Sequence, residues 1–221
     1  MSYRQDLTAF GLENRTYSIE EWQAIEERTG EKFEFIDGRL VNWQAMAGGT
    51  PTHSKITGSL MYLFGANMRE RDRDAPDLVR CDPHSSDLQL KLPGGRKYVY
   101  PDAAIVCGEP VYDTVLKTAI QNPTVVAEVL SESSFQYDTG KKFEYYAKLE
   151  SLREYVLIRQ DEYVVETRTR TEAGGPWQIV FAHEREHVAV LPTLDIELPL
   201  AELYRGIRFD WEDEEEVLAK A

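Results

Sequence analysis

Two short apolar stretches, each interrupted by an acidic residue, constrain the fold of this chain more than any other feature. The stretch Tyr98–Val106 is rich in β-branched, aromatic and small residues and contains Asp102. The nearly continuous apolar run Thr124–Leu130 contains Glu128. Both patterns predict β-strands. A carboxylate inside an apolar strand is costly unless it is paired or bound to a cation. If the two strands are neighbours, the carboxylates converge at one end and can bind a divalent metal through oxygen.

Three further segments accompany these acids. They are Phe33-Glu34-Phe-Ile-Asp37-Gly38, His53-Ser54 and Asp138-Thr-Gly-Lys141-Lys142-Phe. Together with Tyr100-Pro101-Asp102 and Glu128-Val-Leu-Ser131, they form a set of five segments that follow one another along the chain. The ordered set resembles the Uma-type restriction endonuclease family, within the PD-(D/E)XK nuclease superfamily. The resemblance covers roughly residues 18 to 170.

This resemblance implies an α/β fold, with a restriction-endonuclease-like core in which helices flank a mixed central β-sheet. A length of 221 residues suits one domain with a substantial core. We therefore expect a single nuclease-like domain over residues 1–221, with an acidic, solvated C-terminal tail from about residue 208.

The resemblance also implies an Mg²⁺- or Mn²⁺-dependent endonuclease that hydrolyses DNA phosphodiester bonds. Asp102 and Glu128 are the expected metal ligands, and the peptide carbonyl of Val129 is a plausible third oxygen. A bound divalent ion can lower the pKa of water and neutralise the phosphate. The alternative for each acid is a structural ion pair or helix cap.

The position of the catalytic lysine departs from the superfamily pattern. Most PD-(D/E)XK enzymes carry a lysine two residues after the glutamate, but that position here is Leu130, which cannot activate water. The Uma-type pattern places the lysine on the following helix, where Lys142 matches it. Beside Glu128, this ammonium is expected to lower the carboxyl pKa. Lys141, about 100° around the helix, is expected to face solvent or a bound phosphate. The alternative is that Lys142 is an ordinary surface lysine.

Three auxiliary residues complete the expected site. Glu34 is the candidate auxiliary acid, which would bind a second metal or orient a water. His53, near a helix N-terminus, either donates to phosphate or is a buried structural histidine. Tyr146 lies one turn after the migrated lysine and either donates a hydrogen bond to a catalytic group or packs in the core.

The formal net charge of −14 is unusual for a protein that binds nucleic acid, because phosphate neutralisation supplies much of that affinity. DNA is therefore expected to bind weakly, at a small local basic groove. One alternative is a non-catalytic nuclease-fold module that binds nucleic acid or protein. Another is a nuclease that acts only with a partner. A homodimer is left open by the sequence, although dimers are common where both strands must be cut.

Cys81 and Cys107 fit no metal-ligand spacing and no disulfide framework, and we expect both to be small core residues. No apolar run approaches the ~18 residues that a membrane-spanning helix needs. The N-terminus also lacks a basic region followed by an apolar one. These features predict a soluble cytoplasmic protein.

The rest of the chain predicts the scaffold around the acid-bearing strands. A capping box at Ser18 and a stop at Gly30 delimit the first helix, and Asp37-Gly38 is the expected turn of a hairpin. Further helices are predicted from residue 51 to about 69 and from about 138 to 149. Strands are predicted at 88–92, 154–158, 163–169 and 177–182, with a short-helix segment over the sheet at 192–207.

Overall fold

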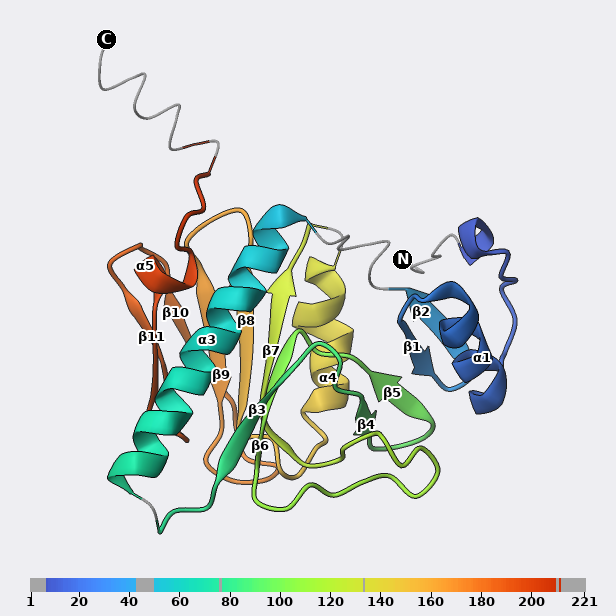
Figure 1. Cartoon of the computed structure of the whole chain (residues 1–221), viewed down its shortest axis with the longest axis horizontal. Coiled ribbons are helices and arrows are strands. Elements are labelled where there is room, and N and C mark those ends of the chain that lie inside the picture. The colour runs from blue at the N-terminus through green and yellow to red at the C-terminus, as the bar shows by residue number, and fades with distance from the viewer. Residues whose placement is uncertain (1–6, 43–49, 76, 133, 210, 212–221) are drawn as a thin grey trace.

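A computed structural model describes residues 7–42, 50–75, 77–132, 134–209 and 211 (Figure 1). The helical elements are η1 (Leu7–Phe10), α1 (Ile19–Thr29), α3 (Pro51–Asp74), η2 (Tyr137–Lys142), α4 (Phe143–Tyr146) and α5 (Leu200–Leu203). The strands are β1 (Phe33–Ile36), β2 (Arg39–Asn42), β3 (Cys81–Ser85), β4 (Leu90–Leu92), β5 (Lys97–Val99), β6 (Ala103–Cys107), β7 (Pro123–Leu130), β8 (Glu154–Arg159), β9 (Val165–Thr169), β10 (Gln178–Ala182), β11 (Val188–Leu191) and β12 (Ile196–Pro199).

The central sheet has six strands in the order β10-β9-β8-β7-β6-β3. Strands β7 and β8 are parallel, and the other neighbouring pairs are antiparallel, so the expected mixed sheet is confirmed. Strand β7 lies between β6 and β8, and every residue of it except Thr124 is buried. A strand buried on both faces reads as a continuous apolar run, which explains the pattern around Glu128.

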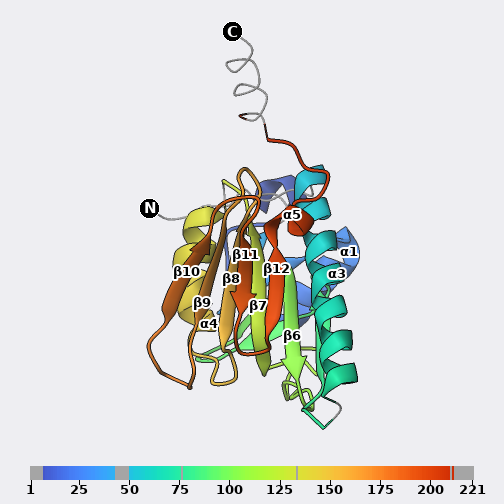
Figure 2. The ribbon, with the colours of Figure 1, turned by 90° about the vertical axis from the view of Figure 1, so that its left-hand side faces the viewer.

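Both faces of this sheet are covered, as Figure 2 shows. On one face α3, α5 and the β11–β12 hairpin pack over residues that include Ile105, Val129 and Val156. On the other face the chain around α4 packs over residues that include Val126, Leu130 and Leu157. Successive side chains of a strand point to opposite faces, so Glu128 shares the α4 face with Val126 and Leu130.

A second, four-stranded sheet has the order β2-β1-β5-β4 and is covered by α1. The capping box at Ser18 and the left-handed Gly30 delimit α1 as predicted. Trp22 of this helix stacks on Phe35 of β1, with ring centroids 5.1 Å apart. The predicted hairpin is also confirmed: β1 and β2 pair through the turn Asp37-Gly38, whose φ angles of 51° and 91° suit a tight hairpin turn.

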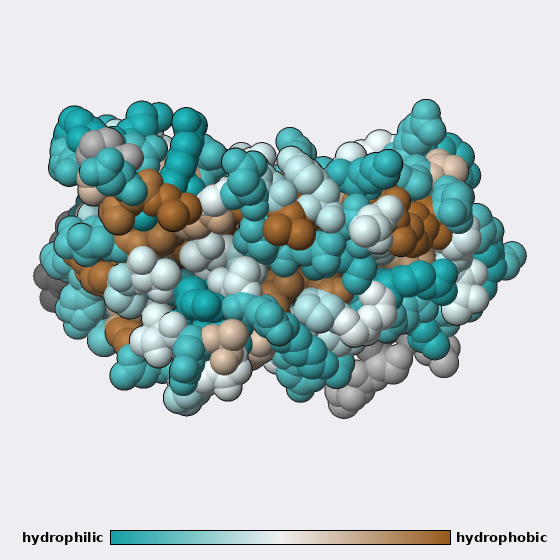
Figure 3. Space-filling view, turned by 90° about the horizontal axis from the view of Figure 1, so that it is seen from below, coloured by the Kyte–Doolittle hydropathy of each residue, from teal (hydrophilic) through white to brown (hydrophobic). Residues whose placement is uncertain are grey.

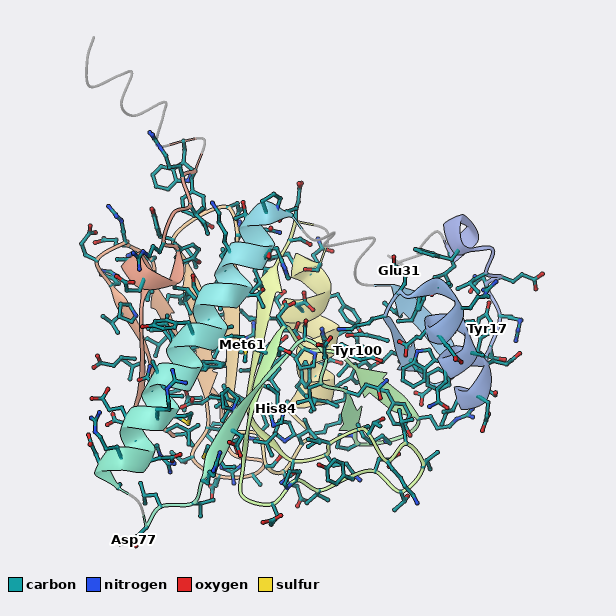
Figure 4. All side chains as sticks on the ribbon, in the orientation of Figure 1. Tyr17, Glu31, Met61, Asp77, His84 and Tyr100 are labelled. Atoms are coloured by element: carbon teal, nitrogen blue, oxygen red, sulfur yellow. A yellow bond between two sulfur atoms is a disulfide. The ribbon has the colours of Figure 1, made fainter. Side chains whose placement is uncertain are left out.

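The predicted strand from Tyr98 to Val106 is wrong, because the chain leaves one sheet and enters the other within it. Strand β5 belongs to the four-stranded sheet and β6 to the central sheet, with Pro101 between them. Proline has no N–H to donate, so it cannot continue a central strand. Tyr100, labelled in Figure 4, lies at this crossing and donates a hydrogen bond to Glu26 of α1.

Strand β3, at the other edge of the central sheet, was not predicted. It pairs with β6 so that Cys81 lies directly opposite Cys107, and a disulfide joins them. The expectation of two unlinked core cysteines is therefore wrong. Sequence spacing carries no information on which strands pair, and this pairing is what brings the two thiols together.

Two other expectations need correction. Helix α3 ends at Asp74, several residues beyond the predicted end near Arg69. The segment 192–207 holds most of the β11–β12 turn, strand β12 and only a four-residue helix. The acidic tail falls almost entirely outside the described residues. In the described part of the chain, no helix combines the length and apolar character needed to cross a membrane.

Candidate active site

Glu128 is the central acid of the site. It lies near the end of β7, buried, on the face covered by α4. Its Oε1 accepts hydrogen bonds from the Lys142 ammonium at 2.8 Å and from the Tyr146 hydroxyl at 2.9 Å. The carboxylate in the apolar strand is therefore paired, and this pairing offsets the cost of burying its charge.

Lys142 reaches Glu128 from η2, a π-helical segment that leads into α4. Its side chain is 1% exposed, whereas that of Lys141 is 57% exposed and pairs with Glu144. The two adjacent lysines thus differ as predicted. Burial lowers the pKa of Lys142, but the charges of Glu128 and Glu34 outweigh it and hold the pKa well above its usual value. The ammonium stays protonated.

Glu34 of β1 is a residue that the four-stranded sheet contributes to the site. Phe33 and Phe35 of β1 face the core under α1, so Glu34 between them points to the opposite side. There it is fully buried, with Oε1 3.0 Å from the Lys142 ammonium. The Tyr137 hydroxyl lies 3.2 Å from Oε2. Residues about a hundred positions apart in the sequence therefore meet at one ammonium.

Asp138 is a third buried carboxylate at this ammonium. Its Oδ1 lies 3.6 Å from the Lys142 nitrogen and accepts no hydrogen bond from the described residues. Burial raises the pKa of Asp138 to about 6, although the nearby charge of Lys142 lowers it. Asp138 belongs to one of the sequence motifs, but no role was predicted for it. Its position four residues before Lys142, on the same helical face, could have indicated that it lies beside this lysine.

The expected lowering of the Glu128 pKa is wrong. Burial raises this pKa well above its ordinary value, Lys142 offsets the rise only in part, and Asp138 and Asp102 add to it. One ammonium faces three carboxylates, so it cannot compensate all of them in a desolvated site. The site has an excess of negative charge.

Asp102 lies at the rim of the same site, directly before β6. Its Oδ2 accepts a hydrogen bond from the Val129 N–H at 2.7 Å. Because Val129 directly follows Glu128, this bond holds the Asp102 carboxylate close to the position of Glu128 in the chain. Its Oδ1 lies 3.1 Å from His53 Nε2. The Asp102 side chain is 19% exposed, so it is the more accessible of the two predicted metal ligands.

His53 is the third residue of α3, whose N-cap is Thr50. Burial lowers the pKa of His53, but the hydrogen bond and charge of Asp102 outweigh it, and the pKa is raised overall. The structure therefore places the predicted residues in two linked groups. Glu34, Glu128 and Tyr146 surround Lys142, while His53 and the Val129 N–H hold Asp102.

The residues suit a hard divalent cation that keeps part of its water shell. Among the described residues, no group of three or more histidine, cysteine or acidic side chains is arranged to hold a metal ion. Mg²⁺ does not require such a cage, since it is usually bound by one or two carboxylates plus water and phosphate oxygens. Asp102 and Glu128 offer two such carboxylates, beside an ammonium that three buried carboxylates surround.

Comparisons with known proteins address the family and the fold. The profile of the Uma2 family, described as “Putative restriction endonuclease”, matches residues 19–201. The “Uncharacterized protein sll1609” of Synechocystis sp. is 32% identical over 146 residues, which are 66% of this chain and 76% of that protein. The “Uncharacterized protein slr1290” of the same organism is 29% identical over 192 residues, 87% and 93% of the two chains.

A solved structure has a similar fold. It is the crystal structure of a “putative nuclease belonging to DUF820” from Anabaena variabilis, with a TM-score of 0.58 at 15% sequence identity. The match covers 80% of this chain and 91% of that one. Since the family profile spans most of the sequence, and the fold agrees with it, the chain belongs to the Uma2 family, “Putative restriction endonuclease”.

Proposed function

We propose that this protein is a metal-dependent endonuclease that hydrolyses DNA phosphodiester bonds. The observation that supports the proposal most is the buried Lys142 ammonium, which contacts Glu128 and Glu34 and lies near Asp138. A buried charge cluster is weak evidence for stability, because desolvation offsets the attraction. Groups whose pKa values are perturbed by burial and by specific charges are, in contrast, typical of catalytic sites.

The metal ligands in this proposal are Asp102, Glu128 and the peptide carbonyl of Val129. When bound there, Mg²⁺ or Mn²⁺ would lower the pKa of a water molecule and neutralise phosphate charge. Three buried carboxylates lie around one ammonium, and this arrangement favours added positive charge. Asp102, held by His53 and by the Val129 N–H, has a fixed orientation at the rim.

Lys142 is the proposed catalytic cation. Held by several carboxylates, its ammonium has little freedom to move, so it can orient the attacking water and offset charge that develops on the phosphate. Glu34 is the auxiliary acid that orients this ammonium, and Tyr146 positions Glu128 through its hydroxyl. His53 acts as the positioning residue of Asp102, because its Nε2 contacts that carboxylate.

The substrate proposed is DNA, bound weakly and locally. A protein with a net charge of −14 cannot rely on a broad basic surface, so affinity would come from the metal site and from few cations near it. This feature also favours the second candidate, a nuclease-fold module that binds without cutting or that cuts only with a partner.

The test is cleavage of supercoiled plasmid by the full-length protein, with Mg²⁺, Mn²⁺, Ca²⁺ or a chelator. We expect nicked and linear DNA with Mg²⁺ or Mn²⁺ only. Asp102→Asn, at a partly exposed position, is expected to lose at least about 100-fold in rate, and the exposed Asp82→Asn is its matched control. Lys142→Ala is expected to be inactive, whereas its neighbour Lys141→Ala keeps most of the activity.

Calorimetric titration with Mn²⁺ separates the two roles. Asp102→Asn should lose metal binding, while Lys142→Ala should retain it or bind slightly more tightly, since a competing cation has been removed. Thermal unfolding of each variant is needed as well, because Lys142→Ala leaves buried carboxylates without their ammonium. Wild-type rates in Asp102→Asn would overturn the proposal. DNA binding without cleavage under any metal would establish the second candidate instead.

A further inference from the structure

The outer edge of β10 is an unpaired strand edge. β10 is the last strand of the central sheet, and Figure 2 shows it at the margin, with β9 on its inner side. Among the described residues, none continues the sheet beyond it. Four of its five residues are exposed, so both faces of the strand, as well as its edge, contact solvent.

The exposed side chains here are apolar. We define the β10 patch as Ile179, Val180 and Phe181 of β10 with Val188 and Val190 of the neighbouring β11, which are between 42% and 63% exposed. A hollow of about 210 Å³ lies between the two strands, and every residue that lines it is uncharged. Figure 3 shows apolar side chains at the left-hand end of the molecule, where Figure 1 places these strands, and also near its middle and its right-hand end.

Natural sheets usually protect such an edge. Edge strands commonly carry lysine, proline, an inward-pointing charge or a bulge that prevents another strand from pairing. Gln178–Ala182 contains no charged residue and no proline, and it pairs with β9 without a bulge. The opposite edge strand, β3, does contain Pro83 and Asp82. Of the two edges of the central sheet, the β10 edge is therefore the one without such protection.

We propose that β10 pairs antiparallel with β10 of a second copy of this chain, so that the protein is a homodimer in which the two central sheets join into one. A two-fold axis near Val180 would place Ile179 of one copy opposite Phe181 of the other. Such aliphatic–aromatic cross-strand pairs are stabilising. The contact is isologous, since the same patch serves both copies and the assembly closes at two.

The exposed area of the β10 patch favours a second copy as the occupant, and its lack of charge permits one. Two chains that each carry a net charge of −14 repel each other, so a dimer requires an interface without charge, and the β10 patch provides one. Gln178–Ala182 contains no acidic residue, so no acids of the two copies face each other within the paired strands. The exposed patch amounts to roughly 500 Å² per copy, so a dimer that covered all of it would bury about 1,000 Å² in total, the lower limit for a specific interface.

The test is the mass of the full-length protein in solution, measured by light scattering and by sedimentation over a range of concentrations. The wild type is expected at twice the chain mass of 25.4 kDa. The double variant Ile179→Lys/Phe181→Lys is expected to dissociate, with the dimer Kd raised at least about 100-fold. Val111→Lys/Val115→Lys is the matched control, because it changes two exposed apolar residues and the net charge equally, away from the patch.

Hydrogen–deuterium exchange of the wild type gives a second readout that needs no variant. Backbone amides within residues 178–182 should be protected at high protein concentration and exchange faster after dilution. A monomeric wild type at every concentration, or a double variant that remains dimeric, would overturn the proposal. Exchange in β10 that does not depend on concentration would do the same. None of these measurements uses nuclease activity, so the result is independent of the proposed function.

Discussion

Glu154 provides a sharp test of how burial controls the electrostatics of this protein. It is the first residue of β8 and is fully buried, away from Lys142 and its carboxylates. Its Oε1 accepts the Thr193 N–H at 2.7 Å, and its Oε2 has no hydrogen-bond partner among the described residues. Burial raises the pKa of Glu154 from 4.5 to about 7, and the Thr193 hydrogen bonds offset this rise only in part.

The magnitude follows from linkage between protonation and folding. The difference between 4.5 and about 7 corresponds to about 3 kcal/mol, at about 1.4 kcal/mol per pKa unit. Because the folded-state pKa is the higher one, this contribution to stability is fully present below about pH 4.5 and is lost as the pH rises through about 7. Between pH 5 and 8, Glu154 is therefore expected to reduce the free energy of unfolding by roughly 2 to 3 kcal/mol.

Glu154→Gln should remove this pH dependence. The measurement is the free energy of unfolding in urea at several values between pH 5 and 8, for wild type, Glu154→Gln and the exposed control Glu150→Gln. Relative to wild type, the Glu154→Gln protein should gain roughly 2 to 3 kcal/mol across this range, on top of a constant offset from the new amide. Parallel pH profiles for wild type and Glu154→Gln would refute the reasoning, whatever the offset.

Two further outcomes are expected. Asp138→Asn removes one carboxylate from the surroundings of Lys142, so plasmid cleavage should fall by roughly 10- to 100-fold, and Mn²⁺ affinity, measured by calorimetry, should weaken because a negative charge near the metal ligands is lost. The Cys81–Cys107 disulfide links residues separated by 26 positions, so reduction should lower the free energy of unfolding by about 3 kcal/mol, and a double serine variant should be insensitive to reductant in urea titrations.

Local signals were sufficient where the interaction that forms an element is itself local. The Ser18 side chain accepts the Glu21 N–H and the Glu21 carboxylate accepts the Ser18 N–H, so four consecutive residues determine the start of α1. The hairpin turn is likewise indicated by Asp37 and Gly38 alone, whose positive φ angles favour residues of this type.

Elements whose position depends on a distant partner were missed. The sequence of β3, Cys-Asp-Pro-His-Ser, has no strand periodicity, and it is a strand only because β6 lies beside it. Its proline is tolerated because β3 is an edge strand. The break between β5 and β6 was missed because the residues on both sides of Pro101 have strand character. Only the strands with which they pair show that β5 and β6 belong to different sheets.

The site shows the same distinction. The resemblance to the Uma-type family predicted that Glu34 and Lys142 would approach Glu128, and the structure brings them together. The direction of the Glu128 pKa was not predictable from that pair alone. It depends on the number of carboxylates that share one ammonium and on how completely they are desolvated, and both quantities are set by the tertiary structure.

A lysine on η2 contacts different parts of the fold from a lysine on the strand. Leu130 shares a face of β7 with Glu128 and packs with Tyr146 in the core beneath α4. A lysine at position 130 would extend from the same strand as the glutamate. The ammonium of Lys142 comes instead from a segment packed over that face, and so it also meets Glu34 from the four-stranded sheet. One buried charge thereby joins β1, β7 and η2, so the geometry of the site depends on how the two sheets and the π-helical segment pack together.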